Sequence, residues 1–376
     1  MAGEWTATRL DVVDVRSWRR VSVDLPPGAT VLSGPNGAGK TSVVEALVMA
    51  CLGVSFRTTR DAEVVRTGAT ALHVGLDLAG PGGAHRREIG YAARQGRRLS
   101  LDGDTARSLG DWRAEGSVLV FLPDELRAVK GPPAARRRHL DRLLEAAEPG
   151  YAGDLAAYSA ALAQRNAALR HVRAGRTGIE AVLPWDEPLV EHGARITIAR
   201  RRAVLDVAAP FARWLEDLGG GPDGVLGIEP SPEAISGTPD DVVREAFAER
   251  LSAARAREVA AGMTLSGPHR DDVFVGQQRA GGVVDLRRVG SQGEQRTAVL
   301  ALLMAHRAYL GARSGIPILV LDDVLSELDP VRRGRLLDAV VGGGQSILTT
   351  ADPAAARAAQ DRGARVVAVR EGLLAA

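Results

Sequence analysis

The first part of the chain alternates between apolar and polar positions, a pattern typical of β-strands. Residues 9–15 and 21–25 alternate, and alternation returns over residues 71–101. Residues 41–52 instead carry apolar side chains at helical spacing, as in an amphipathic or buried helix. The pattern predicts short strands on both sides of one helix.

The middle of the chain has a different period. Over residues 133–218 the apolar positions recur at helical spacing, and between residues 151 and 172 they step by about 3.5 residues. This predicts a long helix packed against another helix, with Arg165 at a position where the seam calls for an apolar residue. Further helices are predicted over residues 189–218 and 240–261.

Strand patterns occur again toward the end of the chain. A Gly- and Pro-rich stretch at 219–239 predicts a loop, strand signals resume at Met263, and residues 345–350 are the last strand predicted. We therefore expect an α/β head built from both chain ends, with an inserted helical lobe. The predicted bounds are 1–122 and 262–376 for the head and 123–261 for the lobe.

Composition narrows the class of protein. The chain has 376 residues, 45% of them apolar and 25% charged, as in a soluble globular protein of one large or two ordinary domains. It has no apolar run of about 18 residues and no signal-like N-terminus. Cys51 is the single cysteine. We expect a cytoplasmic protein without a disulfide, a membrane span or a protein-bound transition metal.

The basic residues are unusual in kind. Lysine and arginine total 48, yet Lys40 and Lys130 are the only lysines, and the formal net charge is +2. A bias in genome composition would explain the excess of arginine equally well as selection for phosphate binding would. The position of each lysine is therefore more informative than the number of arginines.

Lys40 lies in a glycine-rich loop between the apolar run 30–32 and the helix predicted over 41–52. The loop fits G-x-x-x-x-G-K-[ST], whose glycines let backbone N–H groups converge on phosphate oxygens at a helix N-terminus. In this motif the lysine reaches the terminal phosphates and the hydroxyl binds Mg²⁺. The sequence predicts an ATP site with Mg²⁺, formed by Gly34, Pro35, Asn36, Gly37, Ala38, Gly39, Lys40 and Thr41.

Two acids follow a strongly apolar run at 318–321. A strand this apolar is buried on both faces of a parallel sheet, and ligands bind at the carboxyl ends of such strands. Asp322 suits a carboxylate for Mg²⁺, and Asp323 suits a base that orients water. The alternative is a pair of helix N-cap residues.

Another candidate anion site opens the Leu- and Ala-rich segment after residue 290. A serine, a glycine and a helix N-terminus offer a hydroxyl and backbone N–H groups there. The residues are Ser291, Gln292, Gly293 and Glu294. A polar turn, Ser326-Glu327-Leu328-Asp329, follows the acid pair.

In this order the motifs resemble those of the ATP-binding-cassette (ABC) ATPases. Lys40 and Asp322 lie 282 residues apart, as in the chromosome-maintenance and repair branch, but the insert is too short for that branch's long coiled coils. The chain resembles the bacterial RecF recombination-mediator family most closely. The segments that carry this resemblance are 55–58, 131–141, 164–170, 184–186, 267–272 and 322–329.

The resemblance implies an ATP-dependent homodimer. Ser291, Gln292 and Gly293 of one copy would contact the γ-phosphate at Lys40 of the other, and Asp329 would lie across the same interface. It also implies duplex DNA and ssDNA–dsDNA junctions as ligands, RecO/RecR-type mediator partners, recombinase loading at single-strand gaps, and a place in DNA repair, replication and the SOS response.

Three departures from the cassette pattern predict slow hydrolysis. Asp323 replaces the usual glutamate, and Thr349 and Thr350 stand where many relatives place a histidine. Asp124 would substitute for a metal-contacting glutamine near residues 118–123. The sequence leaves open whether the chain is an enzyme; if it is one, we expect a weak DNA-stimulated ATPase.

Arginine pairs are the candidate DNA contacts. Aromatic residues are only 4% of the chain, which favours duplex backbone contacts over base stacking. The candidates are Arg97, Arg98, Arg136 and Arg137, and the alternative for each pair is a solvated face. Two other functions are considered: a transporter's energy-coupling subunit, disfavoured by the long helical insert, and a scaffold that binds ATP and scarcely hydrolyses it.

Overall fold

A computed structural model of the chain describes residues 3–112, 117–121, 127–231, 238–370 and 373–375. The chain folds into two compact units. The first unit joins both chain ends: Met1–Glu125, Asp217–Gly219 and His306–Ala376. The second comprises Leu126–Glu216 and Gly220–Ala305.

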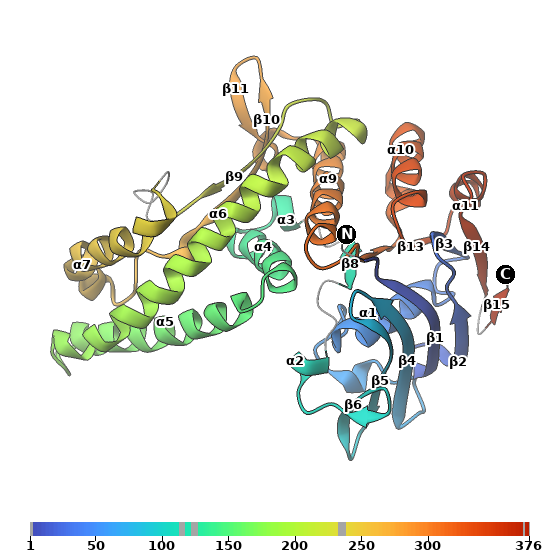
Figure 1. Cartoon of the computed structure of the whole chain (residues 1–376), viewed down its shortest axis with the longest axis horizontal. Coiled ribbons are helices and arrows are strands. Elements are labelled where there is room, and N and C mark those ends of the chain that lie inside the picture. The colour runs from blue at the N-terminus through green and yellow to red at the C-terminus, as the bar shows by residue number, and fades with distance from the viewer. Residues whose placement is uncertain (1–2, 113–116, 122–126, 232–237, 371–372, 376) are drawn as a thin grey trace. The chain divides into compact units, whose positions relative to one another are not determined.

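The centre of the first unit is a six-stranded sheet in the order β15-β14-β3-β13-β12-β8 (Figure 1). Adjacent strands of this sheet are parallel, except that β15 is antiparallel to β14. Two strands from the first third of the chain, β3 and β8, therefore lie in one sheet with four strands from the last third. The bounds are β3 (Ala29–Ser33), β8 (Val118–Phe121), β12 (Ile318–Leu321), β13 (Ser346–Thr350), β14 (Arg365–Arg370) and β15 (Leu373–Ala375).

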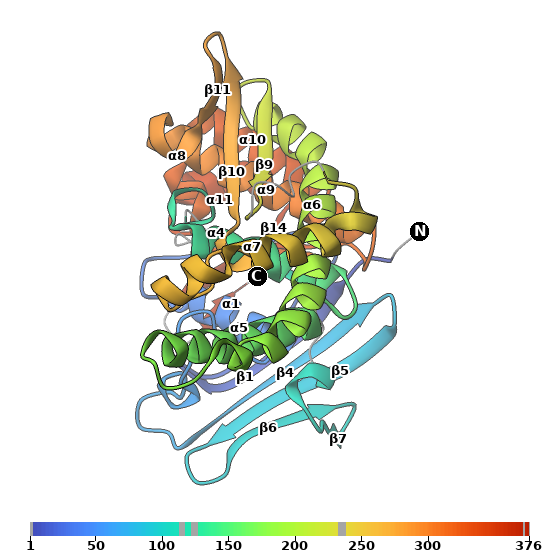
Figure 2. The same cartoon turned by 90° about the vertical axis from the view of Figure 1, so that its left-hand side faces the viewer.

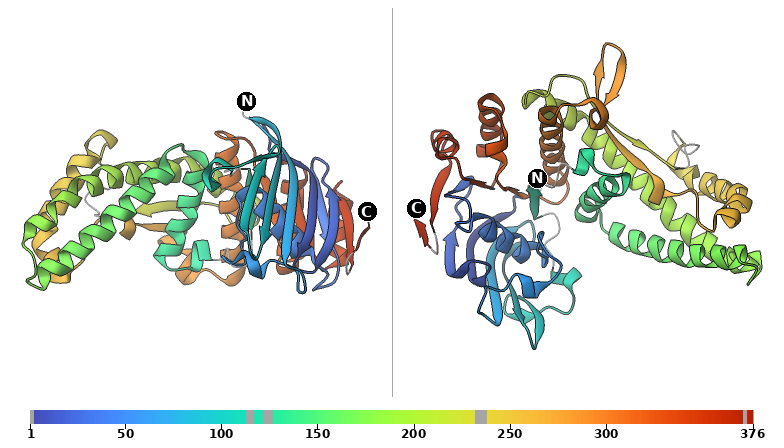
Figure 3. Two further views of the ribbon diagram at one scale, coloured as in Figure 1. Left: turned by 90° about the horizontal axis from the view of Figure 1, so that it is seen from below. Right: turned by 180° about the vertical axis from the view of Figure 1, so that it is seen from behind.

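An antiparallel sheet in the order β2-β1-β4-β5-β6-β7 forms the rest of this unit (Figure 3). Helix α1 (Lys40–Leu52) contacts strands of both sheets and is buried along nearly its whole length. The apolar core of the unit therefore lies around α1. The strands are β1 (Thr6–Val15), β2 (Trp18–Asp24), β4 (Ala71–Gly80), β5 (Gly83–Ala92), β6 (Gly96–Leu101) and β7 (Asp104–Thr105).

Short helices complete the first unit. Helix α10 begins with Pro330 and α11 with Pro353, each capped by the aspartate before the proline, an arrangement that satisfies free N–H groups of the first turn. The helices are η1 (Asp61–Glu63), α2 (Leu109–Trp112), η8 (Val324–Glu327), α10 (Pro330–Val341) and α11 (Pro353–Gln360).

The second unit is mostly helical, with a three-stranded antiparallel sheet. Figure 2 shows β10 (Asp272–Arg279) between β9 (Gly224–Glu229) and β11 (Gly282–Asp285). The α-helices are α3 (Arg127–Lys130), α4 (Pro133–Ala147), α5 (Tyr151–Arg173), α6 (Asp186–Asp217), α7 (Val243–Ala261), α8 (Leu286–Val289) and α9 (Gln292–Gly311). Asp217 at the end of α6 and the part of α9 from His306 onward belong to the first unit. The 3₁₀ turns are η3 (Ile179–Ala181), η4 (Leu183–Trp185), η6 (Asp240–Val242) and η7 (Pro268–Arg270).

Most predicted elements are confirmed, including the helices that became α1, α5 and α6. Three predictions are wrong. The stretch 219–239 is not all loop, because β9 lies within it and pairs with β10. The strand expected from Met263 begins only at Asp272. Strand β13 is not the last, since β14 and β15 follow it.

The predicted domain bounds and the packing units differ most over residues 262–305. The sequence pattern assigns residues 262–305 to the head, but in the structure they pack with the second unit, because β10 pairs with β9 there. The assignment of residues 262–305 to the functional ATPase head stays a prediction. Among the residues that the structure describes, every helix is too short or too polar to pass through a bilayer.

Candidate functional site

The glycine-rich loop lies between β3 and α1, and two of its glycines are required by their surroundings. A Cβ on Gly34 would lie 2.1 Å from the carbonyl oxygen of Val369. Gly39 has a φ of +101°, and a Cβ there would lie 2.7 Å from Trp18 Nε1. Trp18 Nε1 also donates a hydrogen bond to the Gly39 carbonyl at 3.0 Å, which fixes the loop where α1 begins.

Lys40 crosses this loop. Its Nζ donates hydrogen bonds to the carbonyls of Gly34 at 2.8 Å and Pro35 at 3.0 Å. Burial lowers the pKa of Lys40, and the charges of Asp323 and Asp322 oppose that shift. The ammonium therefore lies near both acids and is held by weak neutral acceptors, which an anionic group could replace.

Asp322 is the centre of a small oxygen cluster. Thr41 Oγ1 donates to its Oδ1 at 3.1 Å, and Thr349 Oγ1 donates to the same atom at 2.7 Å. The backbone N–H of Asp323 donates to Thr349 Oγ1 at 2.9 Å. Thr349 therefore links the two acids through one hydroxyl.

Asp323 has two unusual structural features. Its φ is 53°, in the left-handed region, which a non-glycine residue adopts at a cost in energy. Its Oδ1 is buried and receives no hydrogen bond from any residue that the structure describes. A buried carboxylate oxygen without a donor suits a site that receives its donor from a ligand or water.

Strand order explains why these residues meet. In the parallel sheet β13 lies between β3 and β12, so the loop after β3, the acids after β12 and Thr349 on β13 share one edge. This is the edge where parallel sheets bind ligands. The sequence predicted the loop and the acids; the linking role of Thr349 was missed, although its place at the end of a predicted core strand was visible.

The oxygen cluster suits Mg²⁺. Mg²⁺ is held by hard oxygen ligands, usually one or two carboxylates together with substrate phosphates and water. Thr41 and Asp322 supply a hydroxyl and a carboxylate 3.1 Å apart. No group of three or more His, Cys, Asp or Glu side chains that could hold a metal occurs in the described part of the chain. Asp124, the third metal candidate, lies outside the described residues.

The residues 291–294 begin helix α9 in the second unit. Ser291 N donates to Glu294 Oε2 at 2.7 Å, and Glu294 N donates to Ser291 Oγ at 3.2 Å. This reciprocal pair is a capping box that fixes the start of the helix. The Ser291 N–H holds the pKa of Glu294 below its usual value. Ser291 and Gln292 are exposed, and Gly293 is half-buried.

Asp329 caps helix α10. Its Oδ1 accepts hydrogen bonds from the N–H groups of Val331 and Arg332, both at 3.0 Å. The Arg332 N–H contributes most to lowering the pKa of Asp329. Its side chain is therefore held in place, at an exposed position.

Comparison with known proteins identifies the family. A family model described as an AAA domain matches residues 9–99. The DNA replication and repair protein RecF of Moorella thermoacetica is 35% identical over 92% of this chain and 89% of its own length. RecF of Anaeromyxobacter dehalogenans is 38% identical over 91% of both chains. The chain belongs to the RecF family.

Solved structures agree with this assignment. A structure of the recombination mediator protein RecF with ATP, of the RecFOR pathway, matches with a TM-score of 0.83 at 24% identity, covering 100% of this chain and 98% of that one. An Smc head bound to the C-winged helix domain of ScpA matches with a TM-score of 0.60 at 15% identity over 98% and 95% of the two chains. These likenesses confirm the predicted fold class, an α/β ABC-type P-loop ATPase head with an inserted helical lobe.

The candidate DNA contacts differ in how many ion pairs and hydrogen bonds they make within the chain. Arg97 is bidentate to Asp61 at 2.8 and 2.6 Å and also donates to the Gly53 carbonyl. Arg98, its exposed neighbour, makes no ion pair with a described residue. Of the four, Arg98 is thus the most available charge, while a DNA role for any of them stays a prediction for this RecF-family chain.

The other pair supports the fold of the second unit. Arg136 is 3% exposed and bidentate to Asp272 at 2.8 and 2.6 Å. Arg137 donates to the Asp271 carbonyl. Both partners lie in the segment 267–272, which carries part of the family resemblance. Arg136 accordingly presents its charge to Asp272 and not to solvent.

Proposed function

We propose that this RecF-family protein is an ATP-dependent DNA-binding protein of replication and repair, in which bound ATP joins two copies and slow hydrolysis releases them. The observation that carries the proposal is the shared edge of Lys40, Thr41, Asp322 and Thr349 on one parallel sheet. A phosphate loop beside a linked pair of acids is suited to nucleoside triphosphates.

Each residue of the site has a proposed role toward ATP. The N–H groups of Gly37 to Thr41 would bind the phosphate oxygens, and Lys40 would exchange its carbonyl partners for the terminal phosphates. Thr41 and Asp322 would hold Mg²⁺, which neutralises phosphate charge when bound. Asp323 would orient the attacking water; since its side chain is shorter than glutamate, turnover below roughly 10 s⁻¹ is expected.

A second copy would complete the site. Ser291, Gln292, Gly293 and Glu294 of that copy are proposed to contact the γ-phosphate, with Asp329 at the same interface. The capping box at Ser291 supports this role, because it fixes the start of α9 while leaving Ser291 and Gln292 exposed. A ligand that bridges two copies stabilises the dimer in proportion to its differential affinity.

The ligands proposed beyond ATP follow from family membership. They are duplex DNA and ssDNA–dsDNA junctions, RecO/RecR-type mediator proteins, and a recombinase loaded at single-strand gaps. Exposed arginine such as Arg98 supports backbone contact with DNA. A role as a transporter's energy-coupling subunit is disfavoured, because the curated relatives are replication and repair proteins.

Sedimentation velocity tests the proposal. The wild-type protein is expected to be monomeric without nucleotide and dimeric with ATP and Mg²⁺, and duplex DNA is expected to co-sediment with the dimer. Lys40→Arg should stay monomeric, because a planar guanidinium does not fit under the phosphates as an ammonium does. Asp323→Asn should dimerise and dissociate more slowly than the wild type.

The only other lysine provides a matched control. Lys130 is exposed on α3, outside the site, so Lys130→Arg should bind ATP and dimerise like the wild type. Dimerisation of Lys40→Arg equal to that of Lys130→Arg would refute the assignment of the loop. A wild-type protein that stays monomeric with ATP would refute the ATP-driven dimer.

A further inference from the structure

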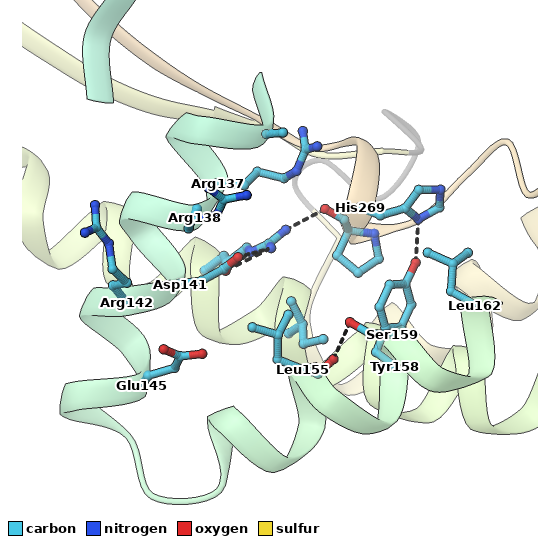
Figure 4. A pocket seen from close by; sticks show the side chains of 14 residues that line it. Arg137, Arg138, Asp141, Arg142, Glu145, Leu155, Tyr158, Ser159, Leu162 and His269 are labelled. Atoms are coloured by element: carbon cyan, nitrogen blue, oxygen red, sulfur yellow. Dashed lines mark hydrogen bonds and ion pairs between the residues drawn. The ribbon is translucent and has the colours of Figure 1, made fainter. Parts of the chain in front are cut away.

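A pocket of about 390 Å³ lies in the second unit, lined by α4, α5, α6 and η7 (Figure 4). Its volume is in the range of pockets that bind small ligands or a few side chains, about 300–1,000 Å³. The nucleotide residues Lys40, Thr41 and Asp322 belong to the first unit. None of the residues proposed to contact ATP or Mg²⁺ lines the pocket.

One wall of the pocket is charged. Helix α4 contributes Arg137, Arg138 and Arg142 together with Asp141 and Glu145. With Arg200 of α6 the lining holds four arginines against two carboxylates, a net charge of +2, and burial keeps His269 neutral near pH 7 by lowering its pKa to about 4. The electrostatics of the pocket favour an anionic ligand.

The arginines differ in how far they are committed. Arg200 is buried and pairs with Asp141 at 3.0 Å and with Asp271 at 2.9 Å. Arg137 is held by the Asp271 carbonyl. Arg138 is exposed and has no ion pair or hydrogen bond from its side chain to a described residue. Arg138 is thus the cation most available to a ligand at this wall.

The opposite wall is apolar. Figure 4 shows Leu155, Tyr158 and Leu162 on α5, at a spacing that aligns them on one helix face. Leu155 and Leu162 are only partly buried, and Pro268 adds a further apolar surface. An apolar side chain of a ligand would remove these surfaces from water, worth about 25 cal/mol per Å².

The walls are rigidly held. Tyr158 Oη and Nδ1 of His269 are hydrogen-bonded at 2.7 Å, which joins α5 to η7. Tyr151 donates to Asp141 at 2.6 Å, and Arg200 donates to the Pro268 carbonyl at 2.6 Å. A pocket fixed by its own hydrogen bonds needs little ordering when a ligand binds.

We propose that this pocket binds an acidic peptide segment of a partner protein, with a carboxylate at Arg138 and an apolar side chain against Leu155 and Leu162. A DNA backbone fits less well, because Asp141 and Glu145 line the same wall and a phosphate backbone has no apolar group for α5. Arginine and tyrosine are enriched among the residues that dominate protein-binding interfaces, and such residues gather in well-packed pockets.

Fluorescence anisotropy of the full chain without nucleotide tests the proposal. The probe is a fluorescein-labelled peptide, Asp-Asp-Leu-Phe-Asp, and it is expected to bind the wild type. Replacing its Leu and Phe by Ala, or its Asp residues by Asn, should each weaken binding. Arg138→Glu should weaken binding about tenfold, since it removes a charge-assisted contact and adds repulsion. Ser159→Trp, an exposed lining position on α5, should abolish binding by filling the pocket.

Arg170→Glu is the matched control, because Arg170 is exposed on α5 and does not line the pocket. It should bind the peptide like the wild type, and all three variants should keep ATP binding. The proposal is overturned if the wild type does not bind the peptide, or if Arg138→Glu and Ser159→Trp bind it unchanged. It is also overturned if the Ala-substituted peptide binds equally well while duplex DNA displaces it, which would indicate a DNA contact.

Discussion

Thr349 shows how a single hydroxyl can organise a site. It donates to Asp322 and accepts from the Asp323 N–H, so it fixes the relative positions of the proposed metal ligand and the proposed base. Most cassette enzymes have a glutamate at the second acid; here a shorter acid, Asp323, is combined with a threonine on the neighbouring strand. The threonine fixes where the backbone of this shorter acid lies.

Thr349→Val should therefore weaken Mg²⁺ binding. Valine has a similar shape but no hydroxyl, and loss of a hydrogen-bond partner behind a metal ligand weakens metal affinity about 10- to 100-fold. The Mg²⁺ concentration for half-maximal ATP binding should rise accordingly, while ATP affinity without Mg²⁺ stays the same. Titration of ATP binding against Mg²⁺ measures this. Thr349→Ser is the control, and equal Mg²⁺ dependence of the Val and Ser variants would contradict the role.

His269 makes the stability of the second unit depend on pH. Burial lowers its pKa from the usual 6.5 to about 4, with smaller contributions from the charges of Arg270, Arg137 and Arg200. The unfolded chain therefore binds this proton more readily than the folded chain. Stability from this source is fully present above pH 6.5 and is lost as the pH falls toward 4.

Between pH 7 and pH 5 the wild type should lose about 2 kcal/mol of unfolding free energy through His269. His269→Asn keeps a partner for Tyr158 but does not titrate, so it should lack that part of the loss. Hydrogen exchange of amides in the 126–305 unit at both pH values measures the difference. Parallel pH profiles for the wild type and the Asn variant would contradict it.

At the scale of elements, the helix seam contains a buried ion pair. Arg165 of α5 is fully buried, donates to Asp186 at 2.7 Å and to Thr264 at 2.9 Å, and lies 2.8 Å from Glu258 of α7, which is also fully buried. The sequence identified Arg165 as an exception in an apolar seam. It could not identify the partners, because Thr264 lies 99 residues away along the chain.

Arg165→Met should destabilise the protein by about 3–5 kcal/mol, because it leaves the Glu258 carboxylate buried without a cation. Adding Glu258→Gln should recover part of that loss, since it removes the uncompensated charge. Urea unfolding followed by the helical circular dichroism signal compares the three proteins. A double variant no more stable than the single one would indicate that packing, not charge, accounts for the loss.

Element by element, the sequence predicted most where the period was long and regular. The helices α5 and α6 have many turns of apolar spacing, and each boundary was predicted within a few residues. Strand β9 was missed because Gly224 and Gly227 give it the composition of a loop, although it pairs with β10 from Glu229 to Gly224. Pairing across more than 40 residues leaves no local signal in six residues.

For the whole molecule, the sequence predicted the fold class and the family, while the predicted division into head and lobe stays a prediction. The loop at Lys40 and the acid at Asp322 could be proposed as site residues because a short motif carries each one. The pocket beside Arg138 could not be predicted, since its lining comes from four separate elements. The sequence segments that supply this lining have ordinary compositions, and only the tertiary arrangement brings their charged and apolar side chains together.

The pairing of an early strand with late strands in the central sheet has a consequence for biosynthesis. The loop 34–41 leaves the ribosome early, but its strand β3 pairs with β13 and β14, which are near the end of the chain. Until residues 346–350 have been made, β3 has neither of its neighbours, and until residues 365–370 have been made it has only one. A chain that terminates prematurely before β13 would thus carry the entire loop without its sheet, and a cell would not accumulate shortened copies competent to bind nucleotide.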